Sequence, residues 1–126
     1  MKPFLEELKS RVVLFDGAMG TEIYNRGIFF NRCYDEINLS KPEMVAEIHR
    51  SYLDSGAEVL TTNTFGANRI RLTQFGLEDR TEEVNRRAVE VAKMVAKDKA
   101  WVAGSIGPIG AALAPIGKIS PGFLFL

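Results

Sequence analysis

The chain has 126 residues, which is enough for one domain with a hydrophobic core. Its 46% apolar and 25% charged residues are ordinary for a globular protein and exclude intrinsic disorder. The 16 basic residues balance the 16 acidic ones, so the charge gives no reason to expect binding to nucleic acid or to a membrane. Cys33 is the only cysteine and cannot form an internal disulfide, which predicts a reducing, cytoplasmic setting. No stretch approaches the roughly 20 apolar residues that a membrane span needs.

The N-terminal part predicts a short amphipathic helix followed by a buried strand. The helix is expected over residues 3–10, where Leu5 and Leu8 share one face. The strand is expected over residues 12–15, a continuous apolar run that stops at Asp16. A short strand that is apolar on both faces is typical of a buried parallel sheet.

A longer helix is expected next, with Ser40 as its N-cap and Gly56 as its C-cap. Pro42 suits the first turn, where its missing N–H costs nothing. The apolar stripe of this helix is expected to consist of Met44, Val45, Ile48, Tyr52 and Leu53.

Two further strands are expected at residues 57–62 and 101–106, each ending in a polar or glycine-rich turn. Between them, the pattern predicts a short helix at 67–74 and a longer one at 81–96, separated by Gly76. The inner face of the longer helix is expected to carry Val84, Ala88, Val91, Ala92 and Val95.

The order of these elements indicates an α/β fold with a parallel sheet, because strands that alternate with helices connect by right-handed crossovers. Two architectures fit this order, an open doubly wound sheet and a (β/α)₈ barrel. In both, ligand sites gather at the carboxyl ends of the strands. A barrel typically needs about 250 residues. The chain holds only about three strand–helix units, so it cannot close a barrel alone.

The turn after the first strand is the strongest candidate site. Asp16 stands at the tip of the strand, and Gly17 and Gly20 allow backbone amides to approach a ligand. A carboxylate accepts hydrogen bonds from an ammonium group, and free amides donate to a carboxylate, so the segment suits an α-amino acid. The alternative is that Asp16 is the N-cap of a helix in a tight turn. The spacing matches neither a dinucleotide fingerprint nor a P-loop.

The tips of the other two strands carry weaker signals. Thr61, Thr62, Asn63 and Thr64 lie at the tip of the second strand, where two roles are open: binding a polar substrate, or holding the loop by side-chain bonds to the backbone. Ser105 lies among small residues after the third strand, which leave room for a ligand but are also common in turns.

Five segments in this order resemble the homocysteine S-methyltransferase family, and the similarity extends from about residue 11 to residue 119. Within the family, their spacing is similar to the start of cobalamin-dependent methionine synthases. It is closer still to bacterial proteins that join this domain to a methylenetetrahydrofolate reductase. The segments are residues 13–21, 38–43, 48–52, 56–68 and 104–108.

The resemblance implies that residues 1–126 are the N-terminal portion of a (β/α)₈ TIM barrel, truncated at the C-terminus. The parent enzyme would transfer a methyl group to the sulfur of homocysteine and produce methionine. In the family, the aspartate holds the substrate amino group, and amides of the glycine-rich turn take its carboxylate. The substrate-binding residues implied here are Asp16, Gly17, Ala18, Met19, Asn63 and Ser105.

The resemblance also implies a zinc ion held by three cysteines of later strands, which this sequence lacks, together with a glutamate that partners the aspartate. A free thiol with a pKa of ~8.5 is mostly protonated at neutral pH, and zinc removes that proton. Cys33 is not expected to bind metal, because even with His49 it supplies only two of about four ligands. We therefore expect no catalytic residue and an inactive chain on its own.

The resemblance further implies methyltetrahydrofolate or cobalamin as the methyl carrier, and a reductase or cobalamin domain downstream in the parent protein. After residue 121 the sequence departs from the family and ends in an apolar run at 123–126, as in a truncation or a shifted reading frame. Such a tail and an unpaired strand edge favour association. The alternative function is therefore a small self-associating α/β binding or interaction module without catalysis.

Overall fold

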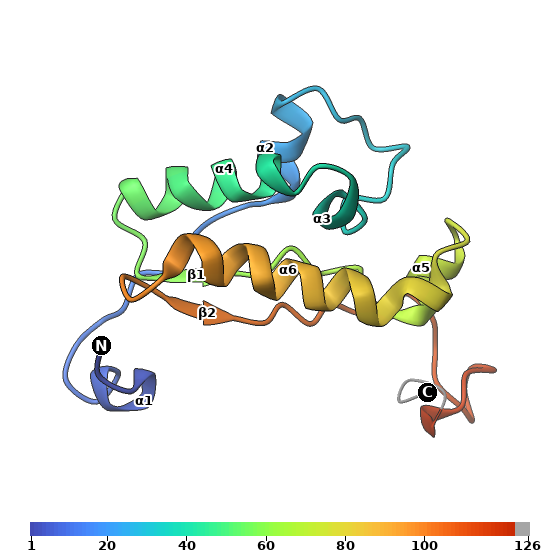
Figure 1. Cartoon of the computed structure of the whole chain (residues 1–126). Helices are drawn as coiled ribbons and strands as arrows, with labels where there is room; N and C mark the ends of the chain where they lie inside the picture. Colours follow the sequence, from blue (N-terminus) through green and yellow to red (C-terminus); the bar gives the residue numbers. More distant parts are fainter. Residues whose placement is uncertain (123–126) are drawn as a thin grey trace.

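The structure is a computed structural model, and it describes residues 1–122. It is a mixed α/β arrangement in which helices α4 and α6 pack against each other and against two short strands (Figure 1). The elements, in chain order, are α1 (Phe4–Glu7), α2 (Gly20–Asn25), α3 (Ile37–Ser40), α4 (Pro42–Asp54), β1 (Val59–Thr61), α5 (Arg69–Thr73), the 3₁₀ turn η1 (Glu78–Arg80), α6 (Thr81–Ala96) and β2 (Trp101–Ala103).

Strands β1 and β2 pair in parallel, with Leu60 opposite Val102, so the predicted parallel pairing of these two strands is confirmed. Both are shorter than predicted, because regular pairing stops where the chain turns into the loops at their carboxyl ends. Residues 57–62 and 101–106 still lie side by side beyond β1 and β2, since the Thr62 N–H donates to the Ala103 carbonyl at 2.9 Å.

The first predicted strand, residues 12–15, forms only a single parallel bridge, between Phe15 and Val59. Its prediction as a buried strand is wrong: Val12 is 90% exposed, Leu14 56% and Phe15 45%. The segment follows β1 through bonds such as Glu58 N–H to the Leu14 carbonyl at 2.8 Å. Phe4 of α1 packs edge-on against Phe15, with ring centroids 6.1 Å apart, but Val12 and Leu14 stay in contact with solvent.

Helix α4 begins one residue later than predicted, and Ser40 is not its N-cap. Ser40 is the last residue of α3, and its hydroxyl donates to the Glu36 carboxylate at 3.0 Å. Lys41 takes the N-cap position and Pro42 the first turn. At the other end, Gly56 has a φ of +103° and its N–H donates to the Leu53 carbonyl, which confirms the predicted glycine cap.

The predicted apolar stripe of α4 faces the core. Val45 and Ile48 are fully buried, and Met44, Tyr52 and Leu53 are partly buried against the same cluster.

Helix α6 has the predicted bounds and inner face. Val84, Ala88, Val91, Ala92 and Val95 are all buried. Gly76, with a φ of +69°, separates it from α5, as predicted.

Helix α5 is shorter than predicted, because Asn68 becomes its N-cap and accepts the Arg71 N–H at 3.0 Å. Helix α1 is also shorter than predicted, and both Leu5 and Leu8 are exposed. Phe4 instead packs edge-on against Trp101, with ring centroids 5.6 Å apart.

The core lies between the helices and one face of the strands. Its largest buried side chains come from α2, α3, α4 and β1, and α6 closes the cluster. In Figure 1, α4 and α6 lie lengthwise along the strands, while the chain between α2 and α3 loops out beyond them. None of the helices in residues 1–122 has the length and apolar character that a bilayer span requires. This packing places the tips of the strands at one open end of the core.

Candidate functional site

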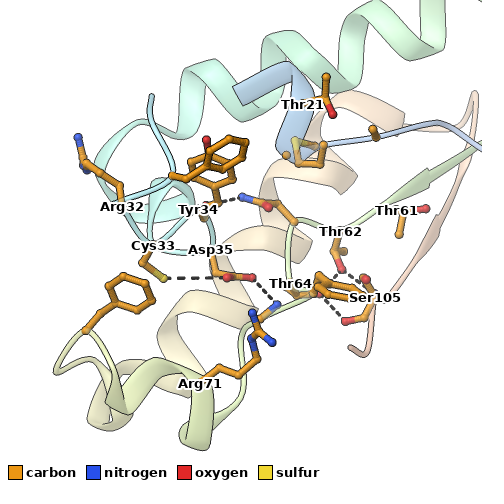
Figure 2. A pocket seen from close by; sticks show the side chains of 18 of the residues that line it. Thr21, Arg32, Cys33, Tyr34, Asp35, Thr61, Thr62, Thr64, Arg71 and Ser105 are labelled. Atoms are coloured by element: carbon orange, nitrogen blue, oxygen red, sulfur yellow. Dashed lines mark hydrogen bonds between the residues drawn. The ribbon is translucent and has the colours of Figure 1, made fainter. Parts of the chain in front are cut away.

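A cavity of about 540 Å³ lies at the carboxyl ends of the strands (Figure 2). Its walls are the turn at 17–21, the loop at 32–35, the tip of β1 at 61–66, part of α5, and Ser105. Segments that are far apart in the sequence meet here because parallel strands end at the same edge, which is where α/β folds bind their ligands.

Asp16 lies at this edge, directly before the turn that lines the cavity. One carboxylate oxygen accepts the Thr61 backbone N–H at 2.8 Å, and the other accepts the Thr61 hydroxyl at 2.7 Å. Asp16 therefore joins the first segment to the tip of β1. It is not a helix N-cap, because α2 begins at Gly20 with Met19 in the cap position and no side-chain cap bond.

The turn after Asp16 presents free backbone donors to the cavity. Within residues 1–122, the N–H groups of Gly17, Ala18 and Met19 have no hydrogen-bond acceptor. The Tyr52 hydroxyl holds the turn by donating to the Ala18 carbonyl at 2.7 Å. A Cβ at Gly17 would lie 3.0 Å from that hydroxyl, so the close approach favours glycine. Burial raises the pKa of Tyr52, which keeps its hydroxyl a donor.

Asn63 is buried beside the cavity, and its amide holds the loop before α3. Its Nδ2 donates to the Tyr34 carbonyl at 2.8 Å and to the Asn38 side chain at 3.1 Å. In turn, the side-chain Nδ2 of Asn38 donates to the backbone carbonyl of Asn63 at 2.8 Å. Both N–H donors of the Asn63 side chain are therefore used, and only its oxygen is available to a ligand.

Ser105 is fixed by its backbone to the threonines at the tip of β1. The Thr62 hydroxyl accepts the Ser105 N–H at 3.0 Å, and the Thr64 hydroxyl donates to the Ser105 carbonyl at 2.8 Å. The two threonine hydroxyls lie 2.7 Å apart. Since Thr64 gives its proton to Ser105, Thr62 is the donor between them. This chain of bonds ties the loop after β2 to the loop after β1.

The sequence did not single out Asp35 and Arg71, which also line the cavity. The Asp35 carboxylate accepts the Gly66 N–H at 3.0 Å and the Cys33 thiol at 4.0 Å. Burial raises the pKa of Asp35, against a smaller lowering by the Gly66 hydrogen bond and the Arg71 charge. No local signal marks these residues, because the contact depends on the loop before α3 folding back onto the tip of β1.

His49 is fully buried on α4. Neither of its ring nitrogens has a hydrogen-bond partner among the described residues. Burial lowers the pKa of His49, and the charge of Asp16 opposes this more weakly. The imidazole is therefore held in its neutral form next to the charged edge of the site.

Residues 1–122 offer no group of three or more His, Cys, Asp or Glu side chains that could hold a metal ion. Burial raises the pKa of the Cys33 thiol, which makes it a poorer metal ligand still. The described residues therefore do not fit a zinc centre.

Comparisons with known proteins agree on one family. The family model for homocysteine S-methyltransferase matches residues 13–123. Methionine synthase from Mycobacterium leprae is 33% identical over 116 residues, and that from Mycobacterium tuberculosis is 32% identical over the same length. Each alignment covers 82% of this chain but only 10% of the relative, so the chain spans a small part of these proteins.

Solved structures of the homocysteine methyltransferase MmuM from Escherichia coli resemble the fold. The metallated form superposes with a TM-score of 0.71 at 26% identity, over 83% of this chain and 41% of that one. The oxidized form gives the same TM-score at 27% identity, over 82% of this chain and 40% of that one. The chain thus spans less than half of the solved relatives.

Proposed function

The chain belongs to the homocysteine S-methyltransferase family, and we propose that it forms the part of the enzyme that binds the amino-acid end of homocysteine. In this proposal it supplies the first three strand–helix units of a (β/α)₈ barrel, residues 1–126. The observation that carries the proposal is the turn at 17–19, which directly follows the carboxylate of Asp16 and whose three amides have no acceptor within residues 1–122.

The binding mode follows from the charges of an α-amino acid. The ammonium group approaches Asp16, whose two oxygens each accept one bond from Thr61 and keep a second acceptor site. The substrate carboxylate takes hydrogen bonds from the amides of Gly17, Ala18 and Met19. Charge-assisted bonds of this kind are shorter and stronger than neutral ones.

Two further residues complete the proposed substrate site. Asn63 offers its side-chain oxygen, and Ser105 bounds the cavity at the end of β2. With the amino-acid end held at the turn, the rest of the homocysteine molecule extends into the cavity of about 540 Å³.

The parent enzyme would activate the homocysteine thiol with zinc, as the family resemblance implies. The described residues supply no ligand set for that ion, so we assign no catalytic residue and derive no step through the metal. In our proposal this chain binds and orients the substrate, and the methyl transfer requires the rest of the barrel.

The parent protein would take its methyl group from methyltetrahydrofolate or cobalamin and carry a reductase or cobalamin domain downstream. Methionine biosynthesis from one-carbon units would place it in the cytoplasm. These expectations rest on the family resemblance, and the similarity to methionine synthases supports them.

Titration of the 126-residue chain with homocysteine, followed by ¹⁵N NMR, tests the proposal. We expect the amides of residues 17–19 to shift, and Asp16→Asn to weaken binding by about tenfold, because a hydrogen bond to a charged group contributes roughly 1.5–3 kcal/mol. Asp98→Asn, a matched change at an exposed loop position, should leave binding unchanged. Equal affinity of the Asp16→Asn and Asp98→Asn variants, both still folded, would contradict the proposed site.

A further inference from the structure

Tyr52 of α4 is hydrogen-bonded to the turn at 17–19, although it is not among the residues that line the cavity. Its hydroxyl donates to the Ala18 carbonyl at 2.7 Å, across 34 positions of sequence. Its ring packs against the core cluster, one helical turn after the fully buried Ile48. The core therefore determines where the Tyr52 hydroxyl lies, and this hydroxyl in turn holds the Ala18 carbonyl.

The Ala18 carbonyl and the Met19 N–H belong to one peptide group, which is not cis. A trans peptide group is planar, so its C=O and N–H bonds point in opposite directions. Because the Ala18 carbonyl points to Tyr52 on α4, the Met19 N–H points away from Tyr52. Ala18 and Met19 line the cavity and Tyr52 does not, so this orientation favours an N–H that faces the cavity.

Gly17 allows the Tyr52 ring to lie directly against the turn. A Cβ at Gly17 would lie 3.0 Å from the Tyr52 hydroxyl oxygen and 3.1 Å from its Cε1. Burial, together with the charges of Glu22 and Asp16, raises the pKa of Tyr52. The hydroxyl therefore keeps the proton that its bond to Ala18 requires.

The bond from Tyr52 also makes the Met19 N–H a better donor. A hydrogen bond to a carbonyl oxygen draws electrons toward that oxygen and leaves the N–H of the same amide more polar, so that linked hydrogen bonds strengthen one another. A peptide group that is already oriented also loses less conformational entropy when a ligand binds. Both effects act on a ligand carboxylate and not on the ammonium group, which approaches Asp16.

We propose that Tyr52 is a positioning residue that orients the Met19 N–H toward the substrate carboxylate, and that it thereby makes the site selective for amines that carry an α-carboxylate. The proposal rests on the proposed function, in which the amides at 17–19 bind that carboxylate. Tyr52 contacts no substrate atom in this proposal. Its effect reaches the ligand through the peptide group between Ala18 and Met19.

Titration of the 126-residue chain with two ligands, followed by ¹⁵N NMR, tests this role. The ligands are homocysteine and aminopropanethiol, which has the same amine and thiol but no carboxylate. Tyr52→Phe removes only the hydroxyl. It should weaken homocysteine binding by about fivefold, as expected for one hydrogen bond, and should change aminopropanethiol binding by less than about twofold.

Tyr24→Phe is the matched control and should change neither affinity, because Tyr24 is exposed on α2 and does not line the cavity. Equal losses for both ligands in Tyr52→Phe would show that the hydroxyl only supports the fold of the turn, and would overturn the proposal. Homocysteine binding that is unchanged in Tyr52→Phe would overturn it as well.

The ligand-free chain provides a readout that does not depend on the proposed function. Loss of the hydrogen bond in Tyr52→Phe should shift the ¹³C signal of the Ala18 carbonyl and the ¹⁵N signal of Met19, whereas Tyr24→Phe should leave both in place. Signals that do not move in Tyr52→Phe would refute the positioning role. If they move but homocysteine does not bind the wild-type chain, the orientation of this peptide group by Tyr52 stands and the proposed function fails.

Discussion

At the scale of single residues, Asp16 and His49 differ in how their polar atoms are satisfied. Asp16 satisfies both carboxylate oxygens through Thr61 and so connects the first segment to β1. His49 is fully buried on α4, and neither of its ring nitrogens has a hydrogen-bond partner within residues 1–122. An unpaired buried polar group costs free energy, roughly 1–3 kcal/mol by mutational data. His49 is thus a weak point for folding stability, and the cost increases once the ring is charged.

Acid should therefore destabilise the chain through His49. The folded state lowers the pKa of His49, so the unfolded state binds more protons below the ordinary value of 6.5. The free energy of unfolding should be highest above that value and should fall as the pH decreases from 6.5 through the lowered folded pKa. Urea unfolding at a series of pH values measures this slope.

His49 is the only histidine in the sequence, so it is the expected source of a fall in stability between about pH 7 and pH 5.5. His49→Phe should remove most of the slope, and His49→Gln, which does not titrate, should do the same. A slope that persists unchanged in both variants would show that another group is responsible.

At the scale of elements, α4 and α6 stabilise the fold more than the strands do. The strands have three residues each, whereas the two helices contribute half of the buried apolar side chains of the described residues. The amphipathic pattern of each helix buries one stripe and leaves the other face in solvent. Disruption of the contact between these helices should therefore unfold the chain as a whole.

Ile48→Ala, a cavity-forming change at the fully buried stripe of α4, should lower the free energy of unfolding by about 2–5 kcal/mol. Met94→Ala removes a comparable apolar side chain from the outer face of α6, where the residue is 51% exposed, and should change it by less than about 0.5 kcal/mol. Urea denaturation of both variants at one pH provides the comparison. Equal losses in the two variants would contradict the packing of α4 in the core.

At the scale of the whole molecule, the two sides of the strands differ. Helices α4 and α6 cover one side, but the segment at 12–15 presents Val12, Leu14 and Phe15 to solvent. Exposed apolar side chains that lie together favour association with another protein surface. An unpaired strand edge can also form hydrogen bonds with a strand of another chain. A chain of this shape is expected to bury that surface against another polypeptide.

The isolated chain should accordingly self-associate as its concentration rises. Replacement of Val12 and Leu14 by lysine should shift the population toward the monomer, because charge opposes the burial of that surface. Met94→Lys is the control, since it places the same charge on the exposed face of α6. Sedimentation velocity over a range of concentrations measures the effect. A wild-type chain that stays monomeric at every concentration would contradict the expectation.

The sequence by itself determined the elements whose stability is local and periodic. The stripe of α6, the glycine cap at Gly56 and the parallel pairing of β1 and β2 were predictable, since spacing and backbone conformation specify them within a few residues. The family was also predictable, because its motifs follow in order along the chain.

Only the tertiary structure decided which groups have hydrogen-bond partners and which remain available to a ligand. Asn63 uses both amide donors on the loop before α3, the amides at 17–19 have no acceptor within residues 1–122, and the charge of Arg71 acts on the Asp35 carboxylate. The same holds for the segment at 12–15, which looks buried in the sequence but is exposed. The reason is physical: burial and hydrogen-bond partners depend on contacts between segments distant in sequence, and local patterns do not encode those contacts.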